Sequence, residues 1–265
     1  EGERAITQLA TAITGGKEAE ALTIPGVACR KKGKIIKNPP QFIENMDEIP
    51  YPARHLLPLE LYDRTIEFLD AKPADVMSIS RGCVFNCGFC ETRKLWGNIC
   101  RGFSPKRVIG EIQDLKQRYG TRGIYFINDN FTLRKEATAE LCKLMIEQKL
   151  NITFTSNSRV DYVDEEMLQL MGKAGCRLIS WGIESGNEQI LKHARKGAYP
   201  EKAERALRWA RQAGIMNWGY FIIGLPGETE ETIRRTREYV FSLPVDEFNL
   251  AKFTPFPGSP LYRHI

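Results

Sequence analysis

From Val76 onward the chain alternates apolar, β-branched runs with stretches whose apolar residues recur at helical spacing. Strands that alternate with helices favour a parallel sheet covered by helices, because consecutive parallel strands need a crossover connection. Six runs are predicted to be strands, at 76–80, 123–128, 152–156, 178–182, 217–223 and 247–253. The predicted fold class is therefore α/β.

The helices between these strands begin and end at characteristic residues. Ser104 followed by Pro105 is typical of a helix N-terminus, and Gly120 is expected to end that helix. Gly172 is expected to stop the third helix in the same way. The aliphatic and Met stripes of these helices are interpreted as core packing.

Residues 1–72 lack this alternation. The first stretch predicts a helix that ends at Gly15-Gly16, and residues 26–36 predict a β-hairpin. The apolar face of that helix comprises Ile6, Leu9, Ala10 and Ile13. Five prolines between residues 39 and 58 indicate an extended linker. We therefore expect 1–72 to be the end of an N-terminal domain plus a linker, and 73–265 to be the main α/β domain.

Three of the seven cysteines lie within eight residues, directly after the first predicted strand. Cys83, Cys87 and Cys90 form a C-x3-C-x2-C set, and Gly82 and Gly88 let this loop curl around a bulky group. Thiolates suit iron–sulfur clusters, and a cubane held by three cysteines keeps one iron open. Structural zinc usually has four protein ligands, so a zinc-stabilised binding module without turnover is the less favoured alternative. The remaining cysteines are interpreted as small buried residues: Cys29, Cys100, Cys142 and Cys176.

The composition is that of an ordinary soluble enzyme, with 265 residues of which 42% are hydrophobic. The net charge of +5 is modest, and because Lys and Arg are scattered among acids it does not favour nucleic acid as a partner. No apolar run approaches the roughly 18 residues needed to cross a bilayer, and no secretory signal is visible. An odd number of cysteines, three of them clustered, favours a cytoplasmic location over a disulfide framework.

The cysteine set, with Phe89 before its last member, resembles the C-x3-C-x-Φ-C signature of the radical S-adenosylmethionine (SAM) superfamily, in which Φ is aromatic. The resemblance extends from about Asp75 to about Tyr262. It implies a partial (β/α)6 barrel of the TIM type, a 4Fe–4S cluster on the three cysteines, and SAM chelating the fourth iron beside Phe89. One electron from such a cluster cleaves SAM to a 5′-deoxyadenosyl radical, which abstracts hydrogen from the substrate.

Parallel α/β barrels place active sites at the carboxyl ends of their strands, where this chain carries polar residues. After the second strand, the resemblance implies that Asp129 or Asn130 takes the SAM amino group, although many relatives have Gly-Gly-Glu-Pro there. A capped turn alone would select the same residue types. At the end of the third strand, the polar residues 155–159, Ser156 among them, suit hydrogen bonding to SAM or the substrate, although ordinary loop chemistry would select them too. Arg159 is expected to face a carboxylate or the next helix.

The fourth strand ends in Glu184-Ser185 between glycines. In similar families the matching glutamate contacts the SAM ribose, so Glu184 is expected there, with Ser185 assisting. Lys196, with Arg195 as the alternative, matches the cation that meets the SAM carboxylate. Ordinary surface charge is the other interpretation of these two side chains.

The fifth strand ends in an I-x-G-x-P-G-E-T run, in which the resemblance implies that Ile222 packs on adenine and Gly224 lets the chain turn under the ring. Glu228 is expected to cap the following helix. The sixth strand leads to Phe253 and a T-P-x-P-G-S-x-L-Y run, where adenine contacts are also expected.

The linker run at 47–58, D-E-I-P-Y-P-A-R-H-L-L-P, and the Asp-containing end of the second strand resemble the cobalamin-binding branch of this superfamily. That branch carries a Rossmann-like cobalamin domain ahead of the barrel. Its D-x-H-x-x-G loop does not occur in this sequence, so we expect any such loop upstream of residue 1. Most members transfer a methyl group, and we predict a cobalamin-dependent methyltransferase acting on a small molecule, with flavodoxin or ferredoxin as electron donor.

Two other reactions stay open at this point. Some members of the branch catalyse oxidative cyclisation or ring rearrangement. A methylthiotransferase shares the fifth-strand run but needs an N-terminal cysteine set, and only Cys29 precedes the triad. No individual catalytic residue is predicted.

Overall fold

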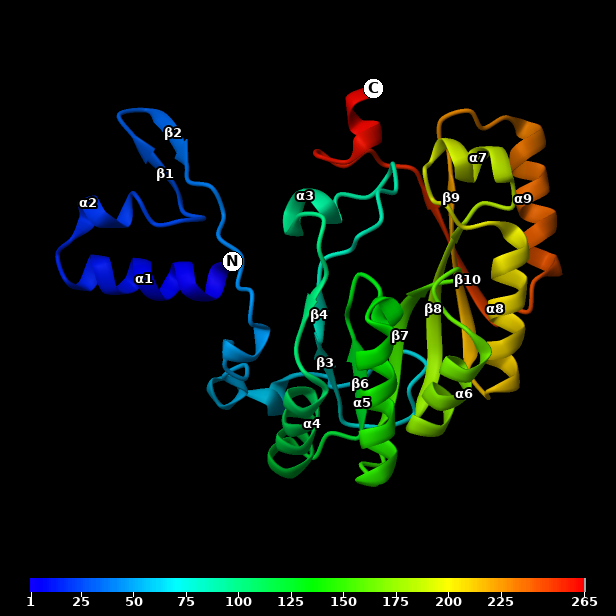
Figure 1. The fold of residues 1–265 in the computed structure, drawn as a ribbon, viewed down its shortest axis with the longest axis horizontal. Helices are drawn as coiled ribbons and strands as arrows, with labels where there is room; N and C mark the ends of the chain where they lie inside the picture. Colours follow the sequence, from blue (N-terminus) through cyan, green and yellow to red (C-terminus); the bar gives the residue numbers. More distant parts are fainter. Residues whose placement is uncertain (265) are drawn as a thin grey trace. The chain divides into compact units, whose positions relative to one another are not determined.

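The computed structural model describes residues 1–264, which divide into two compact units, one from Glu1 to Tyr51 and one that starts at Pro52 (Figure 1). The division expected after residue 72 falls inside the second unit. The reason lies in the linker, whose Arg54 is buried and forms an ion pair of 2.9 Å with Glu111. The linker contains two 3-10 turns, η2 (Arg54–Leu56) and η3 (Leu59–Leu61).

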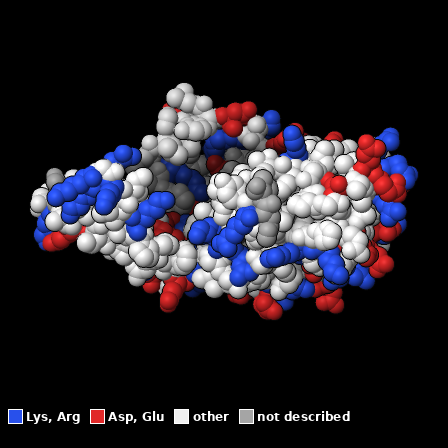
Figure 2. Space-filling model, turned by 90° about the horizontal axis from the view of Figure 1, so that it is seen from above, with Lys and Arg blue, Asp and Glu red and all other residues white. Residues whose placement is uncertain are grey.

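The first unit contains α1 (Gly2–Thr14), α2 (Glu18–Ala21), the hairpin β1 (Ala28–Lys31) and β2 (Lys34–Lys37), and the turn η1 (Met46–Glu48). The predicted hairpin is confirmed. Helix α1 buries Ala12 against Ala21 and Ile24, whereas Ile6 and Ile13 of the expected apolar face are exposed. Figure 2 shows that Lys and Arg are dense on this unit, where the hairpin carries five exposed basic residues: Arg30, Lys31, Lys32, Lys34 and Lys37.

The second unit is built on a parallel sheet of six strands in the order β10-β9-β8-β7-β6-β3. All six predicted strands are present in it. Their bounds are β3 (Ala74–Met77), β6 (Gly123–Phe126), β7 (Thr153–Arg159), β8 (Cys176–Glu184), β9 (Met216–Ile223) and β10 (Glu247–Lys252). Within the described residues β3 and β10 are not paired with each other, so the sheet forms an open, partial barrel.

Four helices pack side by side along one face of this sheet (Figure 1). They are α4 (Pro105–Tyr119), α5 (Lys135–Glu147), α6 (Glu165–Ala174) and α8 (Pro200–Gln212). Their apolar stripes and the facing strand residues form the core, in which Phe126, Phe154 and Trp181 are fully buried. Ser104 caps α4 and Gly120 ends it, as predicted.

Helix α6 does not stop at Gly172, so that prediction was wrong. The helix continues to Ala174 and ends at Gly175, which has the left-handed conformation of a helix C-terminus (φ 108°). A Cβ atom on Gly172 would lie 2.4 Å from the carbonyl oxygen of Ala213. The glycine is therefore there because α6 approaches the end of α8 closely.

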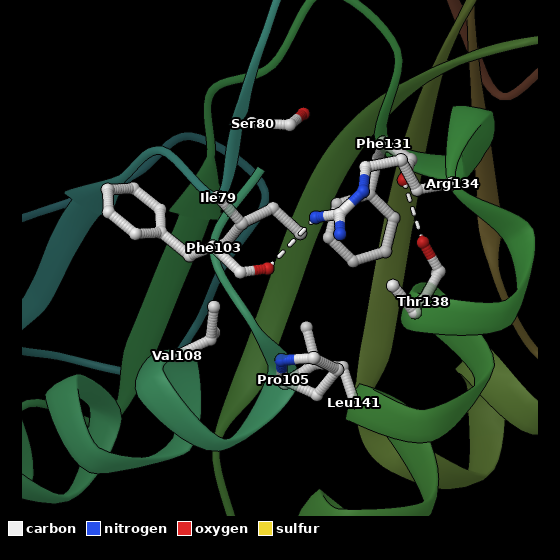
Figure 3. A pocket seen from close by; sticks show the side chains of 10 residues that line it. Ile79, Ser80, Phe103, Pro105, Val108, Phe131, Arg134, Thr138 and Leu141 are labelled. Carbon is white, nitrogen blue, oxygen red and sulfur yellow. Dashed lines mark hydrogen bonds between the residues drawn. The ribbon is translucent and has the colours of Figure 1, made fainter. Parts of the chain in front are cut away.

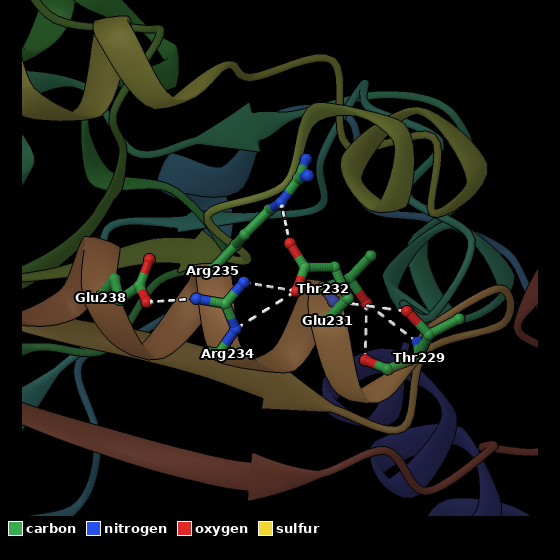
Figure 4. A network of polar contacts seen from close by, with 6 residues as sticks. All are labelled: Thr229, Glu231, Thr232, Arg234, Arg235 and Glu238. Atoms are coloured by element: carbon green, nitrogen blue, oxygen red, sulfur yellow. Dashed lines mark hydrogen bonds and ion pairs between the residues drawn. The ribbon is translucent and has the colours of Figure 1, made fainter.

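Helix α9 (Glu230–Ser242) begins with a cap that involves other residues than expected. Thr229 and Thr232 cap each other's backbone amides, and Arg234 and Arg235 bind Glu231 on the exposed face (Figure 4). The carboxylate of Glu228 instead accepts hydrogen bonds from the backbone amides of Gly224 and Leu225. Glu228 thus stabilises the loop after β9 and does not cap the helix.

The remaining elements lie around the carboxyl ends of the strands or follow them. They are β4 (Ser80–Arg81), α3 (Thr92–Trp96), β5 (Arg101–Gly102), η4 (Phe131–Leu133), α7 (Glu188–His193) and η5 (Pro260–His264). No helix in the described part of the chain is long and apolar enough to span a bilayer.

Candidate active site

The loop that carries Cys83, Cys87 and Cys90 follows β3 and β4, at the carboxyl end of the sheet. Its entry requires Gly82, whose φ is 94° and whose Cβ would lie 2.2 Å from the carbonyl oxygen of Ile99. Further along, the amide of Gly88 donates to the carbonyl of Ala194 at 2.6 Å. The glycines therefore let the loop pack tightly at both of these contacts.

The short antiparallel pair β4–β5 joins the two ends of the segment that carries the cysteine loop and α3. Arg134 reaches across from the start of α5 and donates to the carbonyl oxygen of Phe103 at 2.9 Å (Figure 3). A Cβ on Gly102 would lie 2.1 Å from Nη1 of Arg134. The cavity in Figure 3 has a volume of only about 10 Å³, which is at the limit for a single water, so we assign it to packing and not to a ligand.

Asp129, after β6, braces the cysteine loop at two points. One carboxylate oxygen accepts the amide of Gly82 and the other accepts the hydroxyl of Thr92, both at 2.9 Å. The thiol of Cys90 lies 3.3 Å from the same hydroxyl. Both oxygens of Asp129 thus already have partners in the cysteine loop.

The three cysteines open onto a cavity of about 360 Å³ at the carboxyl end of the sheet. One part of its wall carries charged side chains, namely Asp129, Arg159, Glu184 and Lys196. The rest is neutral and comes mainly from the strands: Asn157, Ser180, Tyr220, Phe221, Ile222 and Ala251. The cavity therefore has a charged region near the thiols and a neutral region along the sheet.

Glu184 and Lys196 form a buried ion pair in this cavity, with 2.6 Å between Nζ and Oε1. Glu184 has a left-handed backbone (φ 72°), which is strained for a residue with a side chain and often marks a functional position. A Cβ on Gly182 would lie 2.6 Å from Oε1 of Glu184 and 2.7 Å from Nζ of Lys196. Gly182 therefore leaves the space that the pair occupies.

Arg159, the last residue of β7, is held by a network of hydrogen bonds. Asp161 accepts from Nε at 2.9 Å and from Nη2 at 2.8 Å, and the backbone carbonyl of Lys196 accepts from Nη2 at 2.6 Å. Nη1 donates to Sγ of Cys87 at 3.3 Å. Burial favours a lower pKa for Arg159, but Asp161 and Cys87 outweigh it and raise the pKa above its usual value, so the side chain is a permanent cation.

Nine of the expected residues meet at this cavity. They are Cys83, Cys87, Phe89, Cys90, Asp129, Arg159, Glu184, Lys196 and Ile222. Six expected contacts are not among the residues that line it within the described chain: Asn130, Ser156, Ser185, Arg195, Gly224 and Phe253.

Local geometry explains two of these six. Successive strand residues point to opposite faces, so Ser156 is fully buried while Asn157 lines the cavity. Asn130 is also buried, and its amide oxygen accepts a hydrogen bond of 3.1 Å from the hydroxyl of Thr132.

Packing and backbone turns explain the other four. Ser185 pairs with Thr236 of α9 at 3.0 Å. Arg195 has φ 51° and is exposed, and the same turn leaves the neighbouring Lys196 buried. Gly224 turns the chain at φ 85°, and Phe253 packs in an apolar cluster with Phe89 and Ile222.

Sequence reasoning missed Tyr125, Ser180 and Tyr220 on the inner face of the sheet, and it noted Asn157 only as part of the polar run that ends the third strand. Asn157 forms hydrogen bonds of 3.0 and 3.2 Å with the hydroxyl of Tyr125. Burial raises the pKa of Tyr220, and a hydrogen bond with Ser180 offsets part of this increase. The sequence did contain a signal for Asn157. Alternate residues of a strand lie on the same face, so Asn157 shares a face with Arg159, which was expected at the site.

The three thiols suit a cluster, because all three line one cavity and thiolates are the usual ligands of iron–sulfur clusters. Burial raises the pKa values of Cys83 and Cys87, and the neighbouring thiolates add to this, while Arg159 and Lys196 lower the value of Cys87. The two cations thus favour the thiolate form of Cys87 that binds iron.

Comparison with known proteins agrees with this geometry. Residues 77–240 match the radical SAM superfamily. The protein named Uncharacterized methyltransferase PH0819, from Pyrococcus horikoshii, is 35% identical over 265 residues, which are 100% of this chain and 56% of that protein. The anaerobic magnesium-protoporphyrin IX monomethyl ester cyclase of Rubrivivax gelatinosus is 30% identical over 270 residues, covering 100% of this chain and 48% of the cyclase.

A solved structure shares the fold. It is TsrM from Kitasatospora setae, a radical SAM methyltransferase with cobalamin and a 4Fe–4S cluster bound, with a TM-score of 0.85 at 22% identity. The match covers 98% of this chain and 53% of that one. The chain thus spans about half the length of the proteins it resembles.

Proposed function

The chain belongs to the radical SAM superfamily, and from this premise we propose that Cys83, Cys87 and Cys90 hold a 4Fe–4S cluster with SAM bound beside it in the cavity. When bound, the cluster supplies the electron and the open iron site for reductive cleavage of SAM. The observation that carries the proposal is that the three thiols share one cavity with the buried Glu184–Lys196 pair.

We propose that Glu184 and Lys196 bind the two polar ends of SAM. A carboxylate accepts hydrogen bonds from both ribose hydroxyls, and an ammonium group pairs with the SAM carboxylate. Without SAM the two side chains neutralise each other, which keeps both charges buried at a tolerable cost. Arg159 already uses four of its five N–H donors on Asp161, the backbone carbonyl of Lys196 and Cys87, which favours the Lys196 ammonium group as the partner of the SAM carboxylate.

Glu184→Gln tests this assignment. A hydrogen bond to a charged group is worth about 1.5–3 kcal/mol, so the dissociation constant for SAM should rise roughly ten- to a hundred-fold. Iron content should stay that of the wild type, because Glu184 lies outside the cysteine loop. Glu204→Gln on the exposed face of α8 is the matched control. An unchanged dissociation constant in Glu184→Gln would remove Glu184 from the SAM site.

For the reaction we propose methyl transfer to a small molecule. The 35% identity over the full chain to a protein named as a methyltransferase supports it. The 30% identity to a cyclase keeps oxidative cyclisation as the second candidate. The test is to incubate the full-length protein with reductant, cobalamin and methyl-labelled SAM. Methyl transfer leaves S-adenosylhomocysteine, whereas cyclisation leaves 5′-deoxyadenosine without it.

We further propose that the substrate lies against the neutral region of the cavity, on Asn157, Ser180 and Tyr220. These side chains offer hydrogen-bond donors and acceptors but no charge, which favours an uncharged polar group on the substrate. The one-electron donor would be a small carrier such as flavodoxin or ferredoxin. An oxygen-labile cluster also needs the reducing conditions of a cytoplasm.

A further inference from the structure

The guanidinium group of Arg159 lies directly against one of the cluster cysteines. Its Nη1 donates to Sγ of Cys87 at 3.3 Å, within the range for a hydrogen bond to sulfur. Its carbon atom Cζ stands 3.8 Å from the ring centroid of Phe85, which belongs to the same loop. A permanent cation is therefore fixed beside the sulfur of Cys87 by contacts on two sides.

The anchors of Arg159 determine which part of it faces the sulfur. The carboxylate of Asp161 binds Nε and Nη2 in a bidentate ion pair. The backbone carbonyl oxygen of Lys196 accepts a second hydrogen bond from Nη2. The oxygen partners thus take the protons of Nε and Nη2, and Nη1 is the nitrogen that donates to Cys87. The side chains of Arg159 and Asp161 are 7% and 9% exposed, so water screens their charges weakly.

The pair is neutral as a whole, but its two charges are at different distances from the sulfur. The cation touches Sγ of Cys87, and the carboxylate lies on the other side of the guanidinium group. Net charge near a cluster and hydrogen bonds to its sulfur ligands both set its reduction potential. A nearby cation stabilises the more negative, reduced form, and so does an N–H donor to sulfur.

We propose that Arg159 is a positioning residue that raises the reduction potential of the 4Fe–4S cluster through its hydrogen bond to Cys87, and that Asp161 holds it there and moderates the effect. The inference rests on the proposed function, since it requires a cluster on the three cysteines. It gives Arg159 a role other than SAM binding.

The test is a redox titration of anaerobically reconstituted protein, followed by the electron paramagnetic resonance (EPR) signal of the reduced cluster. Arg159→Gln should lower the equilibrium constant for one-electron reduction about tenfold, which is about 59 mV toward negative potential. Arg159→Lys keeps the positive charge but loses the bidentate guanidinium group. The reduction potential of this variant should therefore lie between those of the wild type and Arg159→Gln. Asp161→Asn removes the opposing charge and should shift the potential in the positive direction.

Opposite shifts in Arg159→Gln and Asp161→Asn separate an electrostatic role from general damage, which would move both variants the same way. Arg208→Gln removes an exposed arginine on α8 and should leave the potential unchanged. If Arg159→Gln takes up no cluster, Asp161→Asn decides, and an unchanged or lower potential there overturns the proposal. If Arg159→Gln takes up a full cluster at the wild-type potential, the proposal is also overturned. A wild-type protein without any cluster would instead contradict the proposed function itself.

Discussion

Two arginine–aspartate pairs of similar geometry lie at opposite ends of the sheet. At the amino end, Arg64 binds Asp75 of β3 through Nε at 3.2 Å and Nη2 at 2.5 Å. At the carboxyl end, Arg159 of β7 binds Asp161 through the same two nitrogens at 2.9 and 2.8 Å. The pairs differ at the third guanidinium nitrogen, Nη1. In Arg64 this nitrogen donates to the backbone carbonyl of Tyr119, and in Arg159 it donates to the thiol of Cys87.

That difference shows how one interaction can support either stability or chemistry. The partners of Arg64 all belong to the scaffold, because it joins the linker to β3, to the end of α4 and to Thr121. Arg159 joins the cysteine loop to the turn that carries Lys196. In parallel α/β barrels the carboxyl ends of the strands carry the chemistry and the amino ends the stability. The two pairs should therefore respond differently to substitution.

The largest expected effect is the loss of stability in Arg64→Ala. The pair is partly buried, with side chains 15% and 11% exposed, so removing one partner should cost about 3 kcal/mol of unfolding free energy, the lower end of the range for a buried pair. Urea unfolding followed by tryptophan fluorescence measures it, because all four tryptophans lie in the second unit. The exposed variant Arg208→Ala is the control, with a cost within about 0.5 kcal/mol. Equal costs for both variants would mean that Arg64 has no special structural role.

A glycine of the scaffold gives the next effect. In Gly172→Ala the new Cβ would lie 2.4 Å from the carbonyl oxygen of Ala213, and such overpacking costs about 1–3 kcal/mol. The same unfolding assay measures it. A stabilised variant, as expected for alanine in an unhindered helix, would show that α6 and α8 do not approach as closely as described.

A glycine of the site should affect binding more than stability. In Gly182→Ala the new Cβ would meet both Glu184 and Lys196, at 2.6 and 2.7 Å, and displace the pair. We expect about a tenfold weaker affinity for SAM, equal to about 1.4 kcal/mol, with the iron content of the wild type. Equilibrium binding of SAM to the reconstituted protein is the measurement. Wild-type affinity would show that SAM does not depend on this pair.

The smallest expected effect concerns the cap of α6. Asp164 accepts the amide of Met167 at 2.9 Å, and this hydrogen bond is the main cause of its lowered pKa. Asp164→Ala should cost about 1 kcal/mol near neutral pH, whereas Asp164→Asn keeps the cap and should cost less. Because the folded pKa lies below the unfolded one, the contribution is present above the unfolded value. It is lost as pH falls through the folded value, so the wild type and Asp164→Ala should converge in acid. A difference that does not depend on pH would contradict this.

The sequence was sufficient to predict the six strands, because their apolar runs and the helices between them alternate without interruption. It also indicated that Cys83 and Glu184 would come together, since carboxyl ends of parallel strands share one edge, whereas Lys196 was expected there from the family resemblance. Two features depend on contacts far apart in the chain and could not be predicted. The glycine pattern does not distinguish a helix end from a close helix contact, as Gly172 shows. The direction of Arg159 depends on Asp161, Phe85 and a distant backbone carbonyl.

The central claim is that three cysteines and one ion pair form a site for a cluster and SAM. The most direct measurement is the EPR spectrum of the anaerobically reconstituted, reduced protein before and after addition of SAM. We expect about four irons per chain and a spectrum that changes with SAM, since SAM binds the iron that no cysteine holds. The variant in which Cys83, Cys87 and Cys90 are all alanine should bind no cluster. A full cluster in that variant, or a wild-type spectrum that SAM does not alter, would contradict the account.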